Sequence, residues 1–290
     1  MTKRSIIIFL TFAALWLTAG CDNSGKEELI SELVLQGYLY VNKPMSVRLI
    51  RTAPINQFYD EAGVGISGAA VTIWEISGPD STAFTLTEDT TALSGTYVVA
   101  DPEADDTVRS GRHYAIRVET NGRTITAETQ VAAPPIRLDS CRIAGRLLAD
   151  FRNPDVMDTL WYNDPDHPYE VYWTGHPDRY GTTIFIENIE SDWYADWREL
   201  SGHTAYTYSS IFIWTMLTNN SFEVPWITVG FEGRHRVRVI SSDEPCFEYY
   251  QTVFPGYAEM SPETNVRGAL GVFCAIDVDT AYFYLNDPDN

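Results

Sequence analysis

The feature that most constrains the fold is a pair of alternating runs on either side of an Asn-Gly dipeptide. Tyr114, Ile116 and Val118 alternate with polar or small residues before Asn121-Gly122, and the alternation resumes after it. A period of two is typical of β-strands with one buried face. Asn-Gly favours a two-residue hairpin turn, because both central residues of a type I′ turn take positive φ. The segment therefore predicts a β-hairpin.

Other runs of the same kind cover much of the chain. The strongest strand candidates lie at residues 33–41, 47–50, 69–76, 136–148, 169–173, 182–189, 206–216, 224–229, 234–240, 268–276 and 282–285. Seven or so short strands in roughly 100 residues fit an immunoglobulin-like or transthyretin-like sandwich. We therefore predict an N-terminal β-sandwich over residues 33–133.

A proline pair marks the end of this first domain. Pro134-Pro135 stiffens the chain and removes two ladder donors, so a domain boundary is expected there. Residues 134–290 then form an aromatic-rich β domain with one inserted helix near 243–254, because Asp243 is an N-cap candidate ahead of Pro245. The predicted fold is all-β, with two sandwich-like domains, and 290 residues suit two domains.

The first residues predict export and lipidation. Lys3 and Arg4 precede an uncharged apolar run over 6–19, which is short for a membrane span but suits a signal peptide over residues 1–20. The run ends in Leu17-Thr18-Ala19-Gly20-Cys21, which resembles a bacterial lipobox. We therefore expect Cys21 to carry acyl chains that hold the protein at a membrane, with residues 21–32 as a polar tether. A plain secretory signal is the alternative.

Charge excludes one class of partner. Forty acidic residues against twenty basic ones give a net charge of −20, which repels phosphate backbones, so no nucleic-acid partner is expected. The sequence also lacks a nucleophile elbow, a metalloprotease helix, a phosphate loop and a dinucleotide fingerprint. We predict no enzymatic activity.

The segment from Trp161 to Trp226 is rich in aromatic residues and contains six of the eight tryptophans. Trp193 and Trp197 would share one face of a short helix at their i, i+4 spacing, with Tyr194 beside them. Exposed aromatic side chains bind flat ligands and anchor interfaces. The three residues are therefore a candidate ligand or partner surface, and an ordinary sandwich core is the alternative for the segment as a whole.

An oxygen-rich segment around Asp164 and Asp166 is a weak candidate for structural Ca²⁺. It lacks the glycine and the terminal glutamate of an EF-hand loop, and Asx-Pro pairs commonly form turns. Solvated turns are the favoured interpretation, so no cofactor is predicted apart from this possible ion.

Three cysteines remain beyond Cys21. In an oxidising envelope we expect one disulfide and one free thiol, although connectivity does not follow from sequence. The favoured pair is Cys246 with Cys274, because the predicted helix should lie near the closing strand. Three buried thiols are the alternative.

Several short motifs together resemble one family of secreted bacterial lipoproteins, known as domain of unknown function 4249. Besides the lipobox, the matching segments are 33–38, 47–49 with 53–54, 64–71, 95–97, 111–114, 134–135, 247–250 and 265–273. Val266 stands where the family usually has Ile. The resemblance implies an outer-membrane lipoprotein, an accessory of TonB-dependent uptake barrels, with no established activity. We thus expect an outer-membrane protein that acts by binding; a structural or adhesive surface protein is the alternative.

Overall fold

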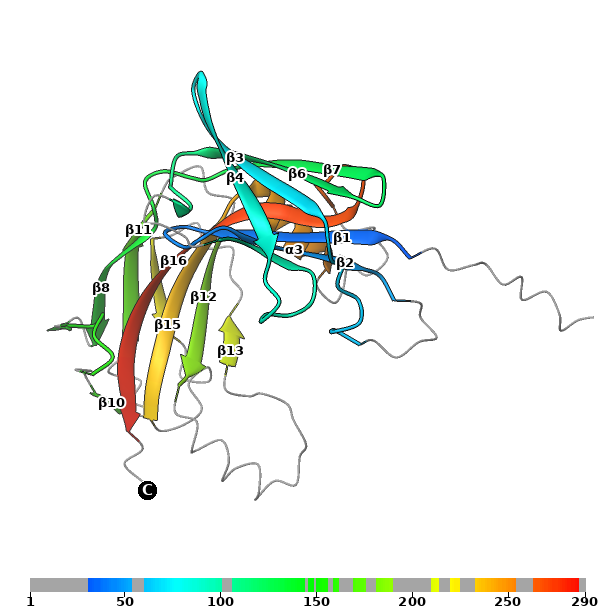
Figure 1. Cartoon of the computed structure of the whole chain (residues 1–290). Helices are drawn as coiled ribbons and strands as arrows, with labels where there is room; N and C mark the ends of the chain where they lie inside the picture. The colour runs from blue at the N-terminus through cyan, green and yellow to red at the C-terminus, as the bar shows by residue number, and fades with distance from the viewer. Residues whose placement is uncertain are drawn as a thin grey trace, which may run out of the picture.

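A computed structural model describes residues 31–53, 60–100, 106–143, 146–148, 150–155, 159–161, 169–175, 181–189, 210–213, 220–224, 233–253 and 263–286. These residues form sixteen strands and one helix, so the protein is mostly β, as the alternating patterns predict. Twelve strands belong to one long sheet and four to a second sheet. Figure 1 shows the long sheet turning from one half of the molecule into the other.

The first unit contains strands β1 to β7. Their bounds are β1 (Leu33–Tyr40), β2 (Ser46–Arg51), β3 (Ala70–Ser77), β4 (Asp80–Glu88), β5 (Thr96–Val99), β6 (His113–Thr120) and β7 (Arg123–Gln130). They follow the order β1-β2-β5-β4-β3-β6-β7, with antiparallel neighbours throughout. Asn121 and Gly122 have φ of 47° and 73° in the β6–β7 turn, which confirms the predicted hairpin.

The first unit encloses its own core because its sheet curls. Alternate side chains of each strand point inward, and Leu35, Ile73 and Ile116 are almost fully buried there. At the far edge, Thr126 on β7 exchanges two backbone hydrogen bonds with Arg267, at 3.1 and 2.8 Å. The two ends of the curled sheet therefore meet beside the start of the last strand.

The second unit packs two sheets face to face. Its strands are β8 (Arg137–Ile143), β9 (Arg146–Leu147), β10 (Thr159–Trp161), β11 (Tyr169–Thr174), β12 (Gly181–Asn188), β13 (Ser210–Ile213), β14 (Ser221–Val224) and β15 (Gly233–Ser242), followed by α3 (Glu244–Val253). The small sheet has the order β14-β11-β8-β9, whereas β13, β12 and β15 extend the long sheet. Leu138, Val171, Ile184 and Val237 lie in the core between them.

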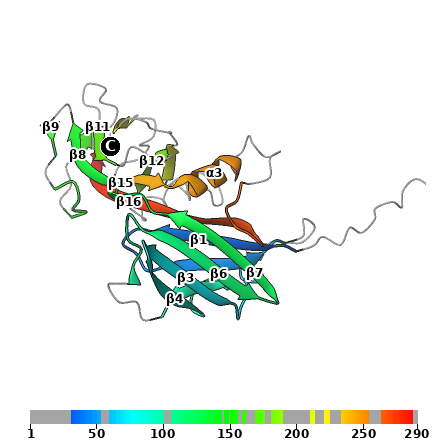
Figure 2. The same cartoon turned by 90° about the horizontal axis from the view of Figure 1, so that it is seen from above.

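The last strand, β16 (Leu270–Asn286), belongs to both units. Its first half runs parallel to β1, from Val34 opposite Leu270 to Tyr40 opposite Ile276. Its second half runs antiparallel to β15. Phe273 is buried in the first core and Phe283 in the second. Figure 2 shows β16 passing between the two groups of strands.

The prediction of two separate closing strands, at 268–276 and 282–285, is wrong, because β16 is continuous over 17 residues. The polar residues that interrupt the apolar pattern have partners at the junction. The Asp277 carboxylate accepts the backbone N–H of Ile136, and Asp279 accepts that of Leu138 at 2.7 Å. These bonds tie the chain that leaves Pro134-Pro135 to the shared strand, so both units depend on β16. The domain boundary at Pro134 itself stays a prediction.

Candidate binding surface around the helix

Most of the site residues predicted from the sequence lie outside the described residues. This holds for Cys21, for Asp164 and Asp166, and for the Trp193, Tyr194 and Trp197 group. Their roles therefore stay predictions. Cys246 and Cys274 are described, and they lie at the helix discussed below.

The helix α3 starts at a buried aspartate, as its sequence predicts. Asp243 is the N-cap: its Oδ1 accepts the backbone N–H of Cys246 at 3.1 Å. Its Oδ2 accepts the N–H of Ala275 on β16 at 2.9 Å and the hydroxyl of Thr129 on β7. Burial raises the pKa of Asp243 to about 6, although these hydrogen bonds act in the opposite direction. One carboxylate thus joins the helix, the shared strand and the first unit.

Packing against β16 fixes which side of α3 faces outward. Cys246 is buried with Val272, Cys274 and Ile276, on the face of β16 opposite the first core. Figure 2 shows α3 on the other side of β16 from β3 and β4. The next turn of the helix therefore brings Tyr249 and Tyr250 to the face of β1 that carries Tyr38.

Four tyrosines gather where α3 packs on this face of β1. We call them the tyrosine cluster: Tyr38, Tyr40, Tyr249 and Tyr250. The rings of Tyr38 and Tyr250 stack at 6.2 Å, and Tyr249 meets Tyr250 edge-on at 6.1 Å. The Tyr38 and Tyr250 hydroxyls interact with each other, and burial raises the pKa of Tyr250 to about 12. Tyr40 and Tyr250 still expose 46% and 39% of their surface.

An arginine continues the surface beyond Tyr40. The Arg238 guanidinium lies 4.5 Å from the centre of the Phe185 ring and donates to Glu187 at 3.2 Å. Arg236 donates to the same Glu187 oxygen at 2.6 Å. Arg238 also interacts electrostatically with Tyr40. We define the α3 surface as the tyrosine cluster together with Phe185 and Arg238.

The α3 surface has the chemistry of a binding site. Tyrosine offers a flat apolar ring and a hydroxyl, and arginine offers planar donors for carboxylate or hydroxyl groups. Residues of these two types carry much of the energy of natural interfaces. Sequence reasoning missed this surface and selected the tryptophans at 193 and 197 instead. The available signal was Tyr38 and Tyr40 at i, i+2, which places both on one face of β1.

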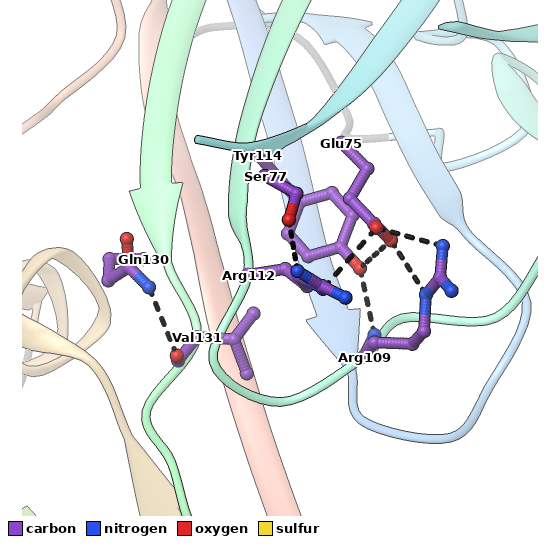
Figure 3. Close-up of polar contacts among 7 residues, drawn as sticks. All are labelled: Glu75, Ser77, Arg109, Arg112, Tyr114, Gln130 and Val131. Atoms are coloured by element: carbon purple, nitrogen blue, oxygen red, sulfur yellow. Dashed lines mark hydrogen bonds and ion pairs between the residues drawn. The ribbon is translucent and has the colours of Figure 1, made fainter. Parts of the chain in front are cut away.

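A second polar cluster lies in the first unit and has a structural explanation. Figure 3 shows the Glu75 carboxylate, which is 4% exposed, held by Arg109 at 2.8 and 3.0 Å and by the Tyr114 hydroxyl at 2.9 Å. Arg112 lies 3.6 Å away and donates to Ser77. Arg109 also donates its backbone N–H to Tyr114 Oη at 2.8 Å. The cluster thus fixes the loop before β6 and leaves Glu75 fully occupied.

The structure places Cys246 and Cys274 next to each other as free thiols, so the predicted adjacency is confirmed, and the disulfide itself stays a prediction. Their sulfur atoms and an Asp243 oxygen all lie within 4.8 Å of one another. Burial raises the pKa of Cys274 well above its ordinary value. Cys141 lies apart from them in the second core, where burial raises its pKa to about 11.

Among the described residues, no helix has both the length and the apolar character needed to cross a membrane.

Comparison with known proteins identifies the family. A family model described as "Domain of unknown function (DUF4249)" matches residues 26–281. The chain belongs to this family. No curated protein matches it.

Two solved structures illustrate a distant likeness. One is titled "Three N-terminal domains of the bacteriophage RB49 Highly Immunogenic Outer Capsid protein (Hoc)"; it has 10% identity and a TM-score of 0.24, over 89% of this chain and 70% of that one. Another, "Crystal structure of CBD12 from CALX1.2", has 12% identity and a TM-score of 0.17, over 87% and 98%. With TM-scores this low, these two structures imply nothing about the function of this chain.

Proposed function

We propose that this DUF4249 protein is a lipoprotein of the outer membrane that acts by binding, as an accessory of a TonB-dependent uptake barrel. The observation that carries the binding role is the α3 surface, where Tyr40 and Tyr250 stay exposed beside Arg238. The lipobox that ends at Cys21 supports the anchoring. For residues 33–133 we further propose an immunoglobulin-like or transthyretin-like sandwich.

The position of the α3 surface along the chain suits a membrane partner. Tyr38 and Tyr40 belong to β1, the first strand after the tether. Residues 21–32 can reach at most about 40 Å when fully extended. The eight residues of β1 add about 26 Å at 3.3 Å per residue. A surface this close to a lipid anchor is within reach of a barrel in the same membrane.

Affinity capture tests the proposal. The full chain, tagged at its C-terminus in its native host, is solubilised in mild detergent, and a TonB-dependent barrel is expected among the captured proteins. The double substitution Tyr40→Ala with Tyr250→Ala should lower recovery of the barrel by at least about tenfold, because exposed tyrosines at interfaces are often energetically dominant. Leu93→Ala is the matched control, since Leu93 is 49% exposed on the first unit.

The outcomes separate the parts of the proposal. Absence of any barrel contradicts the accessory role and favours a structural or adhesive protein. Equal recovery with the double variant and with Leu93→Ala contradicts the role of the α3 surface. Cys21→Ala should release the protein from the membrane fraction, and continued membrane association of that variant contradicts lipid anchoring.

A further inference from the structure

We propose that Cys246 and Cys274 form a structural disulfide that locks α3, and with it the tyrosine cluster, onto β16. This inference rests on the proposed export of the protein to an oxidising compartment. The structure adds two things to the sequence: how close the two sulfur atoms lie, and which helix a bond between them would hold. Both side chains are at most 1% exposed, and their sulfur atoms lie within 4.8 Å.

The two cysteines lie on different elements, the helix α3 and the shared strand β16. Cys246 lies in the first turn of α3, three residues after the Asp243 cap. Cys274 lies in the part of β16 that pairs with β1. A bond between them would close a loop from α3 through to the shared strand, and Tyr249 and Tyr250 follow within one turn of Cys246. The disulfide would therefore hold the helix that carries half of the tyrosine cluster.

A metal ion is the competing use of this group. Among the described residues, Asp243 is the one further potential metal ligand grouped with the two thiols. Its carboxylate already accepts three hydrogen bonds, from Thr129, Ala275 and Cys246. Structural zinc sites use four protein ligands. Disulfide formation needs only the two sulfur atoms, which are already adjacent.

The oxidant would be a dithiol–disulfide oxidoreductase of the cell envelope. One protein thiolate attacks a sulfur of the oxidant's disulfide, which forms a mixed disulfide and releases one thiolate of the oxidant. The second protein thiolate then attacks the mixed disulfide and releases the other. The two protein thiols lose two protons and two electrons in total, and the oxidant's disulfide becomes a dithiol.

Burial sets the order of events. The attacking group must be a thiolate that the oxidant can reach. In the folded protein Cys274 is inaccessible and burial keeps it protonated. The bond must therefore form before α3 docks, during folding, and it is then protected from reductants.

Differential alkylation tests the disulfide. The protein is taken from cells, denatured, alkylated, reduced and alkylated with a second reagent, and peptides are then mapped. We expect Cys246 and Cys274 to carry the second label and Cys141 the first. First label on both would overturn the proposal, and so would labelling that becomes possible only after a chelator is added. The peptide that contains Cys21 reports lipidation separately, so failure of the export proposal is recognised independently.

A second measurement tests the lock. Wild-type protein that is unfolded, reduced and refolded in the presence of reductant should melt about 5–10 °C lower than the oxidised protein, and its amide exchange should be faster in α3 but not in the β6–β7 hairpin. Cys274→Ala should abolish the response to reductant, whereas Cys141→Ala should retain it. Equal responses of the two variants, or unchanged exchange in α3, would overturn the lock.

Discussion

Each unit has its own hydrophobic core, but the strands that enclose the two cores pair in different ways. In the first unit, β3 pairs with β4 and β6 with β7, so neighbours in the sheet are often neighbours in the chain. In the second unit, β11 pairs with β14 and β12 with β15, across long insertions. Both units nevertheless take their last core strand from β16. Local pairing therefore does not make the first unit independent.

The ion pairs of the two units also differ in which residues they join. The Glu75 cluster joins residues of the first unit only, and its carboxylate is 4% exposed, although Arg109 and Arg112 are 43% and 38% exposed. In the second unit Arg152, which is 45% exposed, binds Asp279 on the shared strand at 2.6 Å. The arginines of both clusters reach solvent, but the Glu75 carboxylate is more deeply buried than the Asp279 carboxylate, which is 18% exposed and lies at the junction.

The largest expected effect comes from emptying either core at β16. Phe273→Ala and Phe283→Ala each remove a fully buried ring, so each should lower the free energy of unfolding by about 3–5 kcal/mol. Because the strand is shared, each variant should still unfold in one transition by circular dichroism and by exchange in the β6–β7 hairpin. A Phe283→Ala protein that retains a protected hairpin would show that the units are independent.

Glu75→Gln should have the next largest effect at a fixed pH. It leaves the Arg109 and Arg112 guanidinium groups, which are 43% and 38% exposed, without the buried carboxylate that both contact, and this loss should cost about 2 kcal/mol. Arg152→Gln should cost about 1 kcal/mol or less, because solvent screens that pair. Urea denaturation measures both. If Arg152→Gln lowers the free energy of unfolding as much as Glu75→Gln does, the burial of the Glu75 carboxylate does not set the strength of its ion pairs.

Asp243 should make the connection between the units depend on pH. Its pKa of about 6 lies above the ordinary value of 3.8 because of burial, so its contribution to stability is complete below pH 4 and is lost as the pH rises through 6. Asp243→Asn does not titrate, so relative to wild type it should gain up to about 3 kcal/mol between pH 4 and pH 7.5. Parallel stability profiles of the two proteins in urea would contradict the raised pKa.

Calcium should have the smallest effect. Since Asp164 and Asp166 lie in predicted turns of the second unit, we expect the melting temperature to be the same with calcium and with a chelator. A rise with calcium that Asp164→Asn with Asp166→Asn abolishes would establish an ion site, and would give the second unit a stabilising element that the first lacks.

Local chemistry made part of this structure predictable. The β6–β7 hairpin follows from Asn121-Gly122, and the start of α3 follows from Asp243 and Pro245, because turn and cap preferences depend on adjacent residues. The adjacency of Cys246 and Cys274 was also predicted, from the expected packing of the helix against the closing strand.

Features that depend on distant segments were not predictable. Asp277 and Asp279 indicate a break in the closing strand until their partners, Ile136 and Leu138, are known. The alternating pattern of β1 predicts a strand, but it does not show that this strand pairs in parallel with β16. The tyrosine cluster likewise combines residues from β1 and α3, more than 200 positions apart in the chain.

The pairing of the first strand with the last has a consequence for the order in which the protein is completed. The Leu35 carbonyl oxygen lies 2.0 Å from where a Cβ would sit on Gly271, so the two strands fit only around a glycine with its φ of 104°. A chain synthesised from its N-terminus contains β1 early, but that strand has no partner on one side until residue 270 has been added. The first unit thus stays unfinished, with an unpaired strand edge, for nearly the whole synthesis of the polypeptide, which makes it dependent on protection from aggregation during that time.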